Sequence, residues 1–121
     1  MALIAVWVDR THAKVFNFSP EKLTHKQFAA HTQNHHTHAE DQVEHQKQEL
    51  HFFKEFTPEL SIAEELLILG PGVAKHHFNT FLTEHYPALA KKVVGCESVD
   101  HPTDPQIIAL ARKFFNTERL S

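Results

Sequence analysis

The chain has 121 residues and a formal net charge of −3 with histidine neutral, and hydrophobic residues make up 41% of it. This length predicts one domain, residues 1–121, with a single core. The negative charge argues against a protein that binds nucleic acid mainly through its overall electrostatic field. No apolar run approaches the roughly 20 residues of a membrane span, so no membrane partner is expected.

Cysteine usage bears on the compartment. Cys96 is the only cysteine, which excludes an internal disulfide and favours a reducing, cytoplasmic location. Cys96 is expected to pack as a small residue in a strand, in preference to acting as a reactive thiol. The apolar N-terminus is expected to form a strand and not a signal peptide, because it lacks a basic leader and Asp9 and Arg10 follow at once.

Three strand-like stretches open the chain. Residues 3–8 form an unbroken apolar run, which is typical of an interior strand. Residues 13–18 alternate, with Lys14, Phe16 and Phe18 on one side, and predict a second strand. Residues 23–30 are more polar, as expected of an edge strand with a wet outer face.

A loop and a long helix are predicted next. Residues 31–38 contain no aliphatic residue and no Phe, Tyr or Trp, which indicates a loop. Thr37 and Glu40 have the spacing of a capping box, so a helix is expected over residues 39–56. Thr57-Pro58 ends this helix. Its expected core stripe is Val43, Leu50 and Phe53, flanked by Phe52 and Phe56.

The second half of the chain alternates strands and helices. Four consecutive large apolar residues, 66–69, predict a strand buried on both faces, and Gly70-Pro71-Gly72 ends it. A helix is expected over residues 73–85, a strand over 93–99, and a last helix capped by Asp104. The expected apolar residues are Ala74, Phe78, Phe81 and Leu82 in the first of these helices, and Ile107, Ile108, Leu110, Ala111, Phe114 and Phe115 in the last.

The element order β-β-β-α-β-α-β-α predicts a three-layer α/β fold. A right-handed crossover would place the fourth strand parallel to the first, in a five-stranded mixed sheet of order 3-2-1-4-5 with helices on both faces. Later strands are then added outward on opposite sides of this pair, so the point between the first and fourth strands is a topological switch point. Asp9, the Gly70–Gly72 turn and Asp100 are expected at this switch point, where ligands gather in such sheets.

A family resemblance that covers nearly the whole chain rests on four blocks: Val6–Arg10, His38–Gln42, Ile68–Lys75 and Val93–Asp104. They resemble the small bacterial proteins commonly labelled "translational machinery protein", which are similar to the middle domain of class I release factors and of Pelota. The resemblance implies an RNase H-like sheet and a role in translation.

In release factors the loop before the first helix carries Gly-Gly-Gln, which helps water cleave peptidyl-tRNA. The matching segment here, Ala30–His38, contains Gln33 but no glycine, and alanine and histidine cannot supply the backbone freedom of paired glycines. The resemblance therefore implies a translation-associated module that binds RNA or the ribosome without this hydrolysis.

The histidine-rich segment is the sharpest local feature. It can be a solvated polar loop, an RNA or ribosome contact, since histidines stack on bases, or a zinc or other transition-metal site. The candidate metal ligands are His35, His36, His38, Asp41 and His45. The candidate contacts to RNA or a partner are His31, Gln33, His35, His36, His38, Asp41, Gln42, Gly70, Gly72 and Lys75.

Three other features have two interpretations each. The Gly70–Gly72 turn with Lys75 can cradle a phosphate, or it can simply let helix and strand pack closely. Acidic residues at 9, 41 and 100 can form a two-metal nuclease site, although the fourth strand ends in glycine without an acid. His76 and His77 can form a basic patch with Lys91-Lys92 or a solvated helix face. Trp7 is expected in the core.

The favoured function is a non-enzymatic module that binds RNA or a ribosomal surface in translation, with no required cofactor. One alternative is a metal-dependent hydrolase acting on RNA or peptidyl-tRNA. Another is a small interaction or scaffold protein, in the form of a homodimer through an exposed edge strand.

Overall fold

The computed structural model describes residues 2–18, 23–30 and 41–115, with side chains in the first helix described from residue 47 onward. The five strands and the long helices follow the predicted order. A single helical turn, as expected from a short turn of helix or loop over residues 87–92, follows the second long helix, and a short 3-10 helix that was not predicted follows the first. The strands are β1 (Leu3–Val8), β2 (His12–Phe18), β3 (Leu23–Ala29), β4 (Glu65–Gly70) and β5 (Val93–Ser98). The helices are α1 (Asp41–Phe56), η1 (Thr57–Leu60), α2 (Ala74–His85), α3 (Pro87–Ala90) and α4 (Asp104–Phe115).

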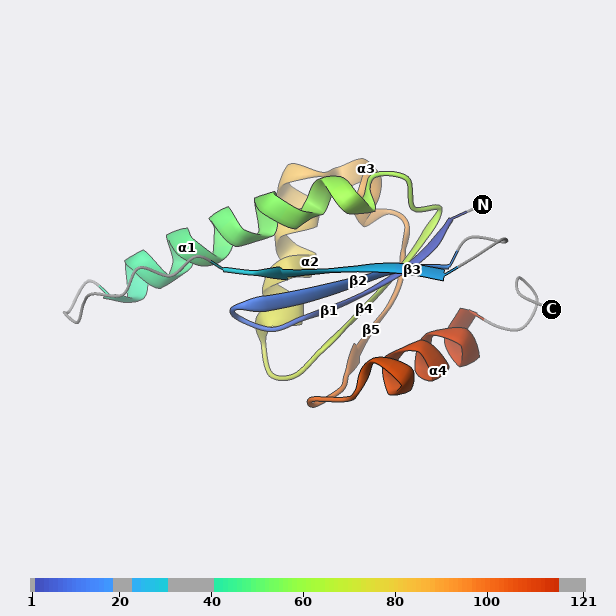
Figure 1. Cartoon of the computed structure of the whole chain (residues 1–121). Coiled ribbons are helices and arrows are strands. Elements are labelled where there is room, and N and C mark those ends of the chain that lie inside the picture. Colours follow the sequence, from blue (N-terminus) through green and yellow to red (C-terminus); the bar gives the residue numbers. More distant parts are fainter. Residues whose placement is uncertain (1, 19–22, 31–40, 116–121) are drawn as a thin grey trace.

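The sheet has the predicted order β3-β2-β1-β4-β5. β1 pairs parallel with β4, and β4 pairs parallel with β5. β2 pairs antiparallel with both β1 and β3. The three-layer prediction is confirmed: α1 and α2 cover one face of the sheet and α4 covers the other (Figure 1).

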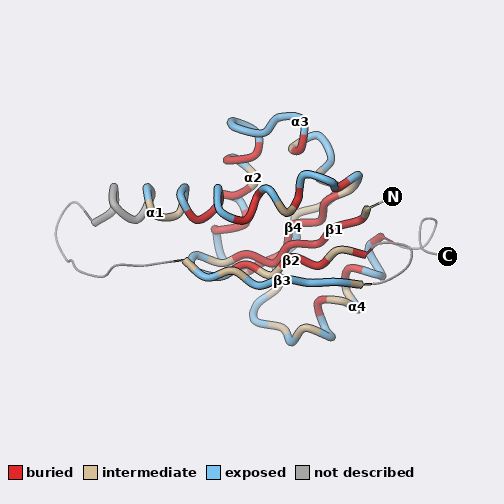
Figure 2. The backbone as a smooth tube through the Cα atoms, turned by 45° about the horizontal axis from the view of Figure 1, so that its top comes forward, coloured by how far each residue is buried: buried red, intermediate tan, exposed pale blue. Residues whose placement is uncertain are grey.

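Burial follows the hydrophobic pattern of each strand. All six residues of β1 are buried, as are Leu66 to Gly70 of β4, whereas β3 is largely exposed (Figure 2). Successive β1 side chains alternate between two clusters. Ile4, Val6 and Val8 pack under α1 and α2, and Leu3, Ala5 and Trp7 pack under α4.

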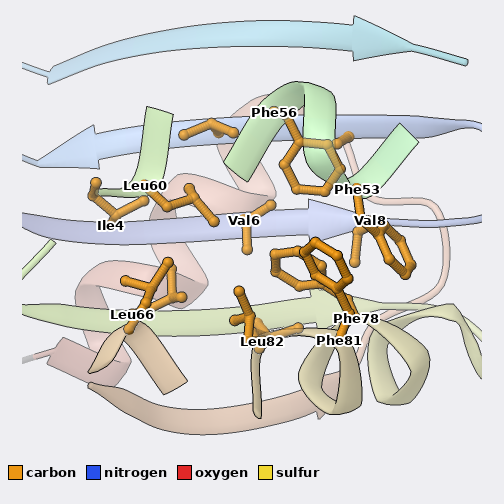
Figure 3. Close-up of a cluster of buried hydrophobic side chains, with 14 of the residues drawn as sticks. Ile4, Val6, Val8, Phe53, Phe56, Leu60, Leu66, Phe78, Phe81 and Leu82 are labelled. Atoms are coloured by element: carbon orange, nitrogen blue, oxygen red, sulfur yellow. The ribbon is translucent and has the colours of Figure 1, made fainter. Parts of the chain in front are cut away.

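Aromatic rings fill the core under α1 and α2 (Figure 3). Phe53 lies with its ring centroid 5.1 Å from that of Phe78 and 5.5 Å from that of Phe81. Phe56 contacts Phe78 at 5.1 Å, and it also contacts Phe28 of the edge strand at 6.0 Å. These ring contacts join α1 to α2 and to the exposed edge strand β3.

The prediction that Leu50 belongs to the core stripe is wrong, because Leu50 is 38% exposed. Phe52, Phe53 and Phe56 are each at most 2% exposed and define the buried side of α1. At about 100° per residue, Leu50 lies roughly 110° from the centre of that side. The prediction for Val43 lies outside the described side chains.

The cap of the last helix also differs from the prediction. The Thr103 hydroxyl accepts a hydrogen bond from the Gln106 amide at 3.3 Å, and the Gln106 side chain accepts one from the Thr103 amide at 2.9 Å. This reciprocal pair is a capping box. Asp104 is therefore not the cap, and its carboxylate instead accepts a hydrogen bond from Lys14 of β2 at 2.8 Å.

The predicted end of α1 is confirmed, and Thr57 contributes to it by donating its hydroxyl to the Phe53 carbonyl at 2.6 Å. The capping box predicted at Thr37 and Glu40 lies outside the described residues. None of the helices described is long and apolar enough to cross a membrane.

Replacement of Phe53 by alanine is expected to lower the free energy of unfolding by about 3–5 kcal/mol, since it removes a buried ring that contacts three others. Leu50→Ala on the same helix is the matched control and is expected to cost under about 1 kcal/mol. Urea denaturation followed by circular dichroism measures both. Equal losses in the two variants would contradict the described orientation of α1.

Candidate functional site

The carboxyl ends of the three parallel strands meet at one edge of the sheet, which we call the carboxyl rim. It comprises Val8–Asp9, Gly70–Gly72 and Val99–Asp100, together with the adjoining connections. The Val99 amide donates to the Gly70 carbonyl at 3.0 Å, which joins two of these ends directly. The residues predicted at the switch point are thus brought to the same edge, where ligands bind in sheets of this kind.

Close packing against β1 requires a glycine at the end of β4. Gly70 has a φ of 155°, and a Cβ atom there would lie 2.1 Å from the carbonyl oxygen of Val8. Gly72 has a φ of 59°, in the left-handed region that favours glycine, but no atom lies within 4 Å of the position a Cβ would take. The turn therefore lets β4 approach β1 before the chain enters α2.

Lys75 is 2% exposed, which is unusual for lysine, and its ammonium group donates a hydrogen bond to the Gly72 carbonyl. This bond closes the turn from within the first turn of α2. In the structure Lys75 stabilises the Gly70–Gly72 turn, and a contact between Lys75 and a phosphate or partner stays a prediction.

Asp9 shapes the connection between β1 and β2. Its Oδ1 atom accepts hydrogen bonds from the amides of Thr11 at 2.9 Å and His12 at 2.6 Å. Its Oδ2 atom lies 4.0 Å from Nε2 of His101. One carboxylate oxygen of Asp9 is thus committed to the backbone of a tight turn.

The indole of Trp7 ties the end of β5 to β1. Trp7 is 4% exposed, as expected of a core residue, and its Nε1 atom donates to the Asp100 carbonyl at 3.2 Å and the Val99 carbonyl at 3.4 Å. The ring of His101 packs against it at 5.6 Å between centroids. The sequence analysis missed this use of Trp7, although a tryptophan next to the end of a strand is the available signal.

A second group that the sequence analysis missed lies under α4. The Asp104 carboxylate contacts Lys14 at 2.8 Å and Nε2 of His25 at 3.7 Å. The His25 ring stacks on Phe16 with centroids 5.3 Å apart. This arrangement links the start of α4 to two antiparallel strands, and only the sheet pairing brings the three segments together.

The nuclease interpretation gains no support from the described residues. Asp9 and Asp100 reach the same edge, but the Asp100 side chain is 91% exposed, and His101, at 3.1 Å, is its only partner among the described side chains. Within residues whose placement is described, no group of three or more His, Cys, Asp and Glu side chains can hold a metal ion. The side chain of the third acid, Asp41, is not described.

Most of the predicted contact and metal residues cannot be placed. His31, Gln33, His35, His36 and His38 lie outside the described residues. The other three open α1 or lie in its first turns, with side chains that are not described: Asp41, Gln42 and His45. A metal site in this segment therefore stays a prediction.

The interpretation of His76 and His77 as part of a basic patch with Lys91-Lys92 is wrong. The Lys92 carbonyl accepts a hydrogen bond from the amide of Leu66, at the start of β4, whereas His76 follows the end of that strand. A six-residue strand is roughly 20 Å long, so the two groups lie near opposite ends of β4. His77 instead contacts Glu49 of α1 at 2.9 Å.

The thiol of Cys96 lies half-buried on β5, 3.9 Å from Nδ1 of His76. Burial raises the pKa of Cys96, the nearby Lys75 ammonium lowers it in part, and Glu97 raises it further. A raised pKa decreases the thiolate fraction near neutral pH, and the thiolate is the nucleophilic form.

Comparison of the sequence with protein-family models and with curated proteins finds no match. Comparison with solved structures finds several similar chains. The archaeal translation termination factor aRF1 matches with a TM-score of 0.70 at 17% identity, over 97% of this chain and 35% of that one.

Two Pelota proteins match in the same way. The Archaeoglobus fulgidus protein has a TM-score of 0.65 at 18% identity, over 98% of this chain and 33% of that one. The Thermoplasma acidophilum protein has a TM-score of 0.64 at 16% identity, over 91% of this chain and 31% of that one. The chain thus spans about a third of the length of each neighbour and shares the fold of a release-factor-like domain.

Replacement of Gly70 by alanine is expected to lower the free energy of unfolding by roughly 3 kcal/mol or more, because the added carbon would overlap the Val8 carbonyl. Gly72→Ala is the matched variant with open space around the new carbon, and only its left-handed backbone costs energy, about 1 kcal/mol. Chemical denaturation compares the two. A Gly70→Ala variant as stable as Gly72→Ala would contradict the close approach.

Alkylation of Cys96 by iodoacetamide at neutral pH is expected to be slower in the folded protein than in urea. The rate should rise with pH through the raised pKa of Cys96, because only the thiolate reacts. Mass spectrometry of timed samples measures the modified fraction. A folded-state rate above the rate in urea would show an activated thiol and contradict the described surroundings.

Proposed function

We propose that this chain is a translation-associated module that binds RNA or a ribosomal surface through its carboxyl rim and the adjoining segment 31–38. The proposal rests first on the fold. That fold is shared with a domain of a translation termination factor and of two Pelota proteins, at TM-scores of 0.64 to 0.70. Identity of 16 to 18% leaves the activity to be argued from the chain's own residues.

The position where the histidine-rich segment leaves the sheet carries the proposal. The Ala30 amide, just after β3, donates to the Thr11 carbonyl at 2.7 Å, beside the turn that Asp9 shapes. The segment therefore departs next to the carboxyl rim, and the chain resumes with α1 at Asp41. A ligand held at the carboxyl rim would lie near Ala30, the last described residue before the histidine-rich segment.

Exposed imidazoles also gather on the described part of the rim. His12 and His101 have side chains 61% and 70% exposed, and both lie beside Asp9. His76 is exposed at the start of α2. Imidazoles stack on unpaired bases when neutral and contact phosphates when protonated. With a net charge of −3 for the whole chain, such binding would be local and sensitive to salt.

The proposal assigns binding and not peptidyl-tRNA hydrolysis. The segment in the position of the release-factor loop contains Gln33, but residues 30–38 include no glycine. Glycine reaches backbone conformations that other residues enter only at a cost in energy. Placement of a glutamine beside an ester bond in the manner of Gly-Gly-Gln is therefore not expected here.

Co-sedimentation with purified ribosomes tests the proposal. The chain is expected in the pellet at low salt and mostly in the supernatant at high salt, because phosphate contacts release counterions. His35→Ala/His36→Ala is expected to weaken binding about tenfold, the scale of one lost stacking contact. A parallel measurement with isolated ribosomal RNA distinguishes an RNA contact from a protein contact.

His51→Ala/His85→Ala provides the matched control. It also removes two imidazoles, from exposed positions on α1 and near the far end of α2, and is expected to leave binding unchanged. A wild-type chain that stays in the supernatant at low salt would contradict the proposed binding to ribosomes. Equal losses in both double variants would show non-specific binding by histidine.

A further inference from the structure

β5 is an edge strand whose outer side pairs with no other described strand. The sheet order ends at β5, which bonds only to β4. The register shifts opposite Leu66 and Leu67, so that Val94 has no partner in β4. Val94 is 42% exposed, and an exposed edge with unpaired backbone groups is a template for pairing with another strand.

The middle of this edge is apolar. Residues 93–96 form an uncharged run, Val93, Val94, Gly95 and Cys96, and the Phe114 ring of α4 packs against Gly95. A Cβ atom on Gly95 would lie 2.4 Å from a Phe114 ring carbon, so the ring sits directly against the backbone of β5. Phe114 is 39% exposed and extends the apolar surface beside the edge.

Charges flank this apolar run with opposite signs. Lys91 and Lys92 precede β5, and Glu97 and Asp100 lie at its other end. Lys91, Lys92 and Glu97 are exposed and form no ion pair with any described residue, and Asp100 contacts only His101. With respect to the described residues, the edge therefore carries unpaired positive charge at one end and negative charge at the other.

The opposite edge of the sheet is different. β3 is polar along its length, and its charged side chains are already paired within the chain. Lys26 contacts Glu59 at 3.1 Å, and His25 contacts Asp104 at 3.7 Å. Charged, paired side chains are a common protection of edge strands. β5 lacks this protection over its central residues.

We infer that β5 is a self-association edge, at which a second copy of this chain adds its own β5 in antiparallel orientation. A twofold axis through the middle of β5 makes the interface isologous. The lysines of each copy then face Glu97 and Asp100 of the other, and the Val94 and Phe114 surfaces of the two copies adjoin. Parallel pairing would put like charges together, so the charge pattern selects the antiparallel dimer and joins two sheets into one.

Charge reversal with complementation tests this interface in the full chain. Lys91→Glu/Lys92→Glu and, separately, Glu97→Lys/Asp100→Lys are each expected to weaken dimerisation about tenfold or more, because each places like charges opposite one another. An equimolar mixture of the two variants is expected to recover it, since every facing pair in the heterodimer is again opposite in sign. Sedimentation velocity over a range of concentrations measures the dimer.

Control variants distinguish the effect of charge at the β5 edge from the effect of net charge. Lys47→Glu/Lys54→Glu changes the net charge by the same amount as the lysine reversals, at exposed positions on α1. Glu55→Lys/Glu84→Lys matches the reversal of the two acids, at exposed positions on α1 and α2. Both are expected to dimerise like the wild type. Val94→Lys places a charge at the centre of the edge and is expected to give a monomer with an unchanged circular dichroism spectrum.

Several outcomes overturn the inference. The first is a wild-type chain that stays monomeric at every concentration. Others are dimerisation unaffected by the charge reversals or by Val94→Lys, and a mixture that stays as weak as its components. Ribosome binding is measured separately, so loss of the dimer leaves the proposed function standing and the reverse also holds.

Discussion

Parallel pairing of β1 with β4 is the constraint on which the rest of the structure depends. Both strands are apolar along nearly their whole length and are buried on both faces. Their side chains alternate between the aromatic core under α1 and α2 and the smaller core under α4. Because neither strand has a polar side to expose, helices must cover both faces of the sheet, and three layers follow.

The same pairing assembles the carboxyl rim. Parallel strands end together, so Asp9, the Gly70–Gly72 turn and the segment around Asp100 meet although they are far apart in sequence. Several polar groups there maintain the fold: Asp9 holds a turn, Lys75 closes another and Trp7 anchors the end of β5. The proposed function assigns partner binding to the exposed imidazoles beside them.

The two edge strands of the sheet, β3 and β5, differ in how their charged side chains are paired. On β3 the charged side chains are paired with η1 and with α4, which protects the strand against pairing and fixes the helices to it. On β5 the lysines and Glu97 form no ion pair with a described residue, and the charges have opposite signs on the two sides of an apolar centre. The binding rim that we propose and the self-association edge that we infer therefore lie at different places on the sheet.

The sequence by itself determined the order of elements, the two doubly buried strands and the sheet order. Hydrophobic periodicity indicates which elements form and which faces are buried, and the right-handed crossover rule restricts how the strands can be ordered. Only the tertiary structure decided how each helix is rotated and which distant groups meet. Leu50 fits the helical period, yet three phenylalanines turn α1 so that Leu50 faces outward. Asp104 has the chemistry of a cap, but Lys14 on a neighbouring strand engages it and Thr103 caps the helix. Lys91-Lys92 and His76 are near in sequence and lie at opposite ends of β4, because α2 and α3 carry the chain from the carboxyl end of β4 back to the amino end of the parallel strand β5.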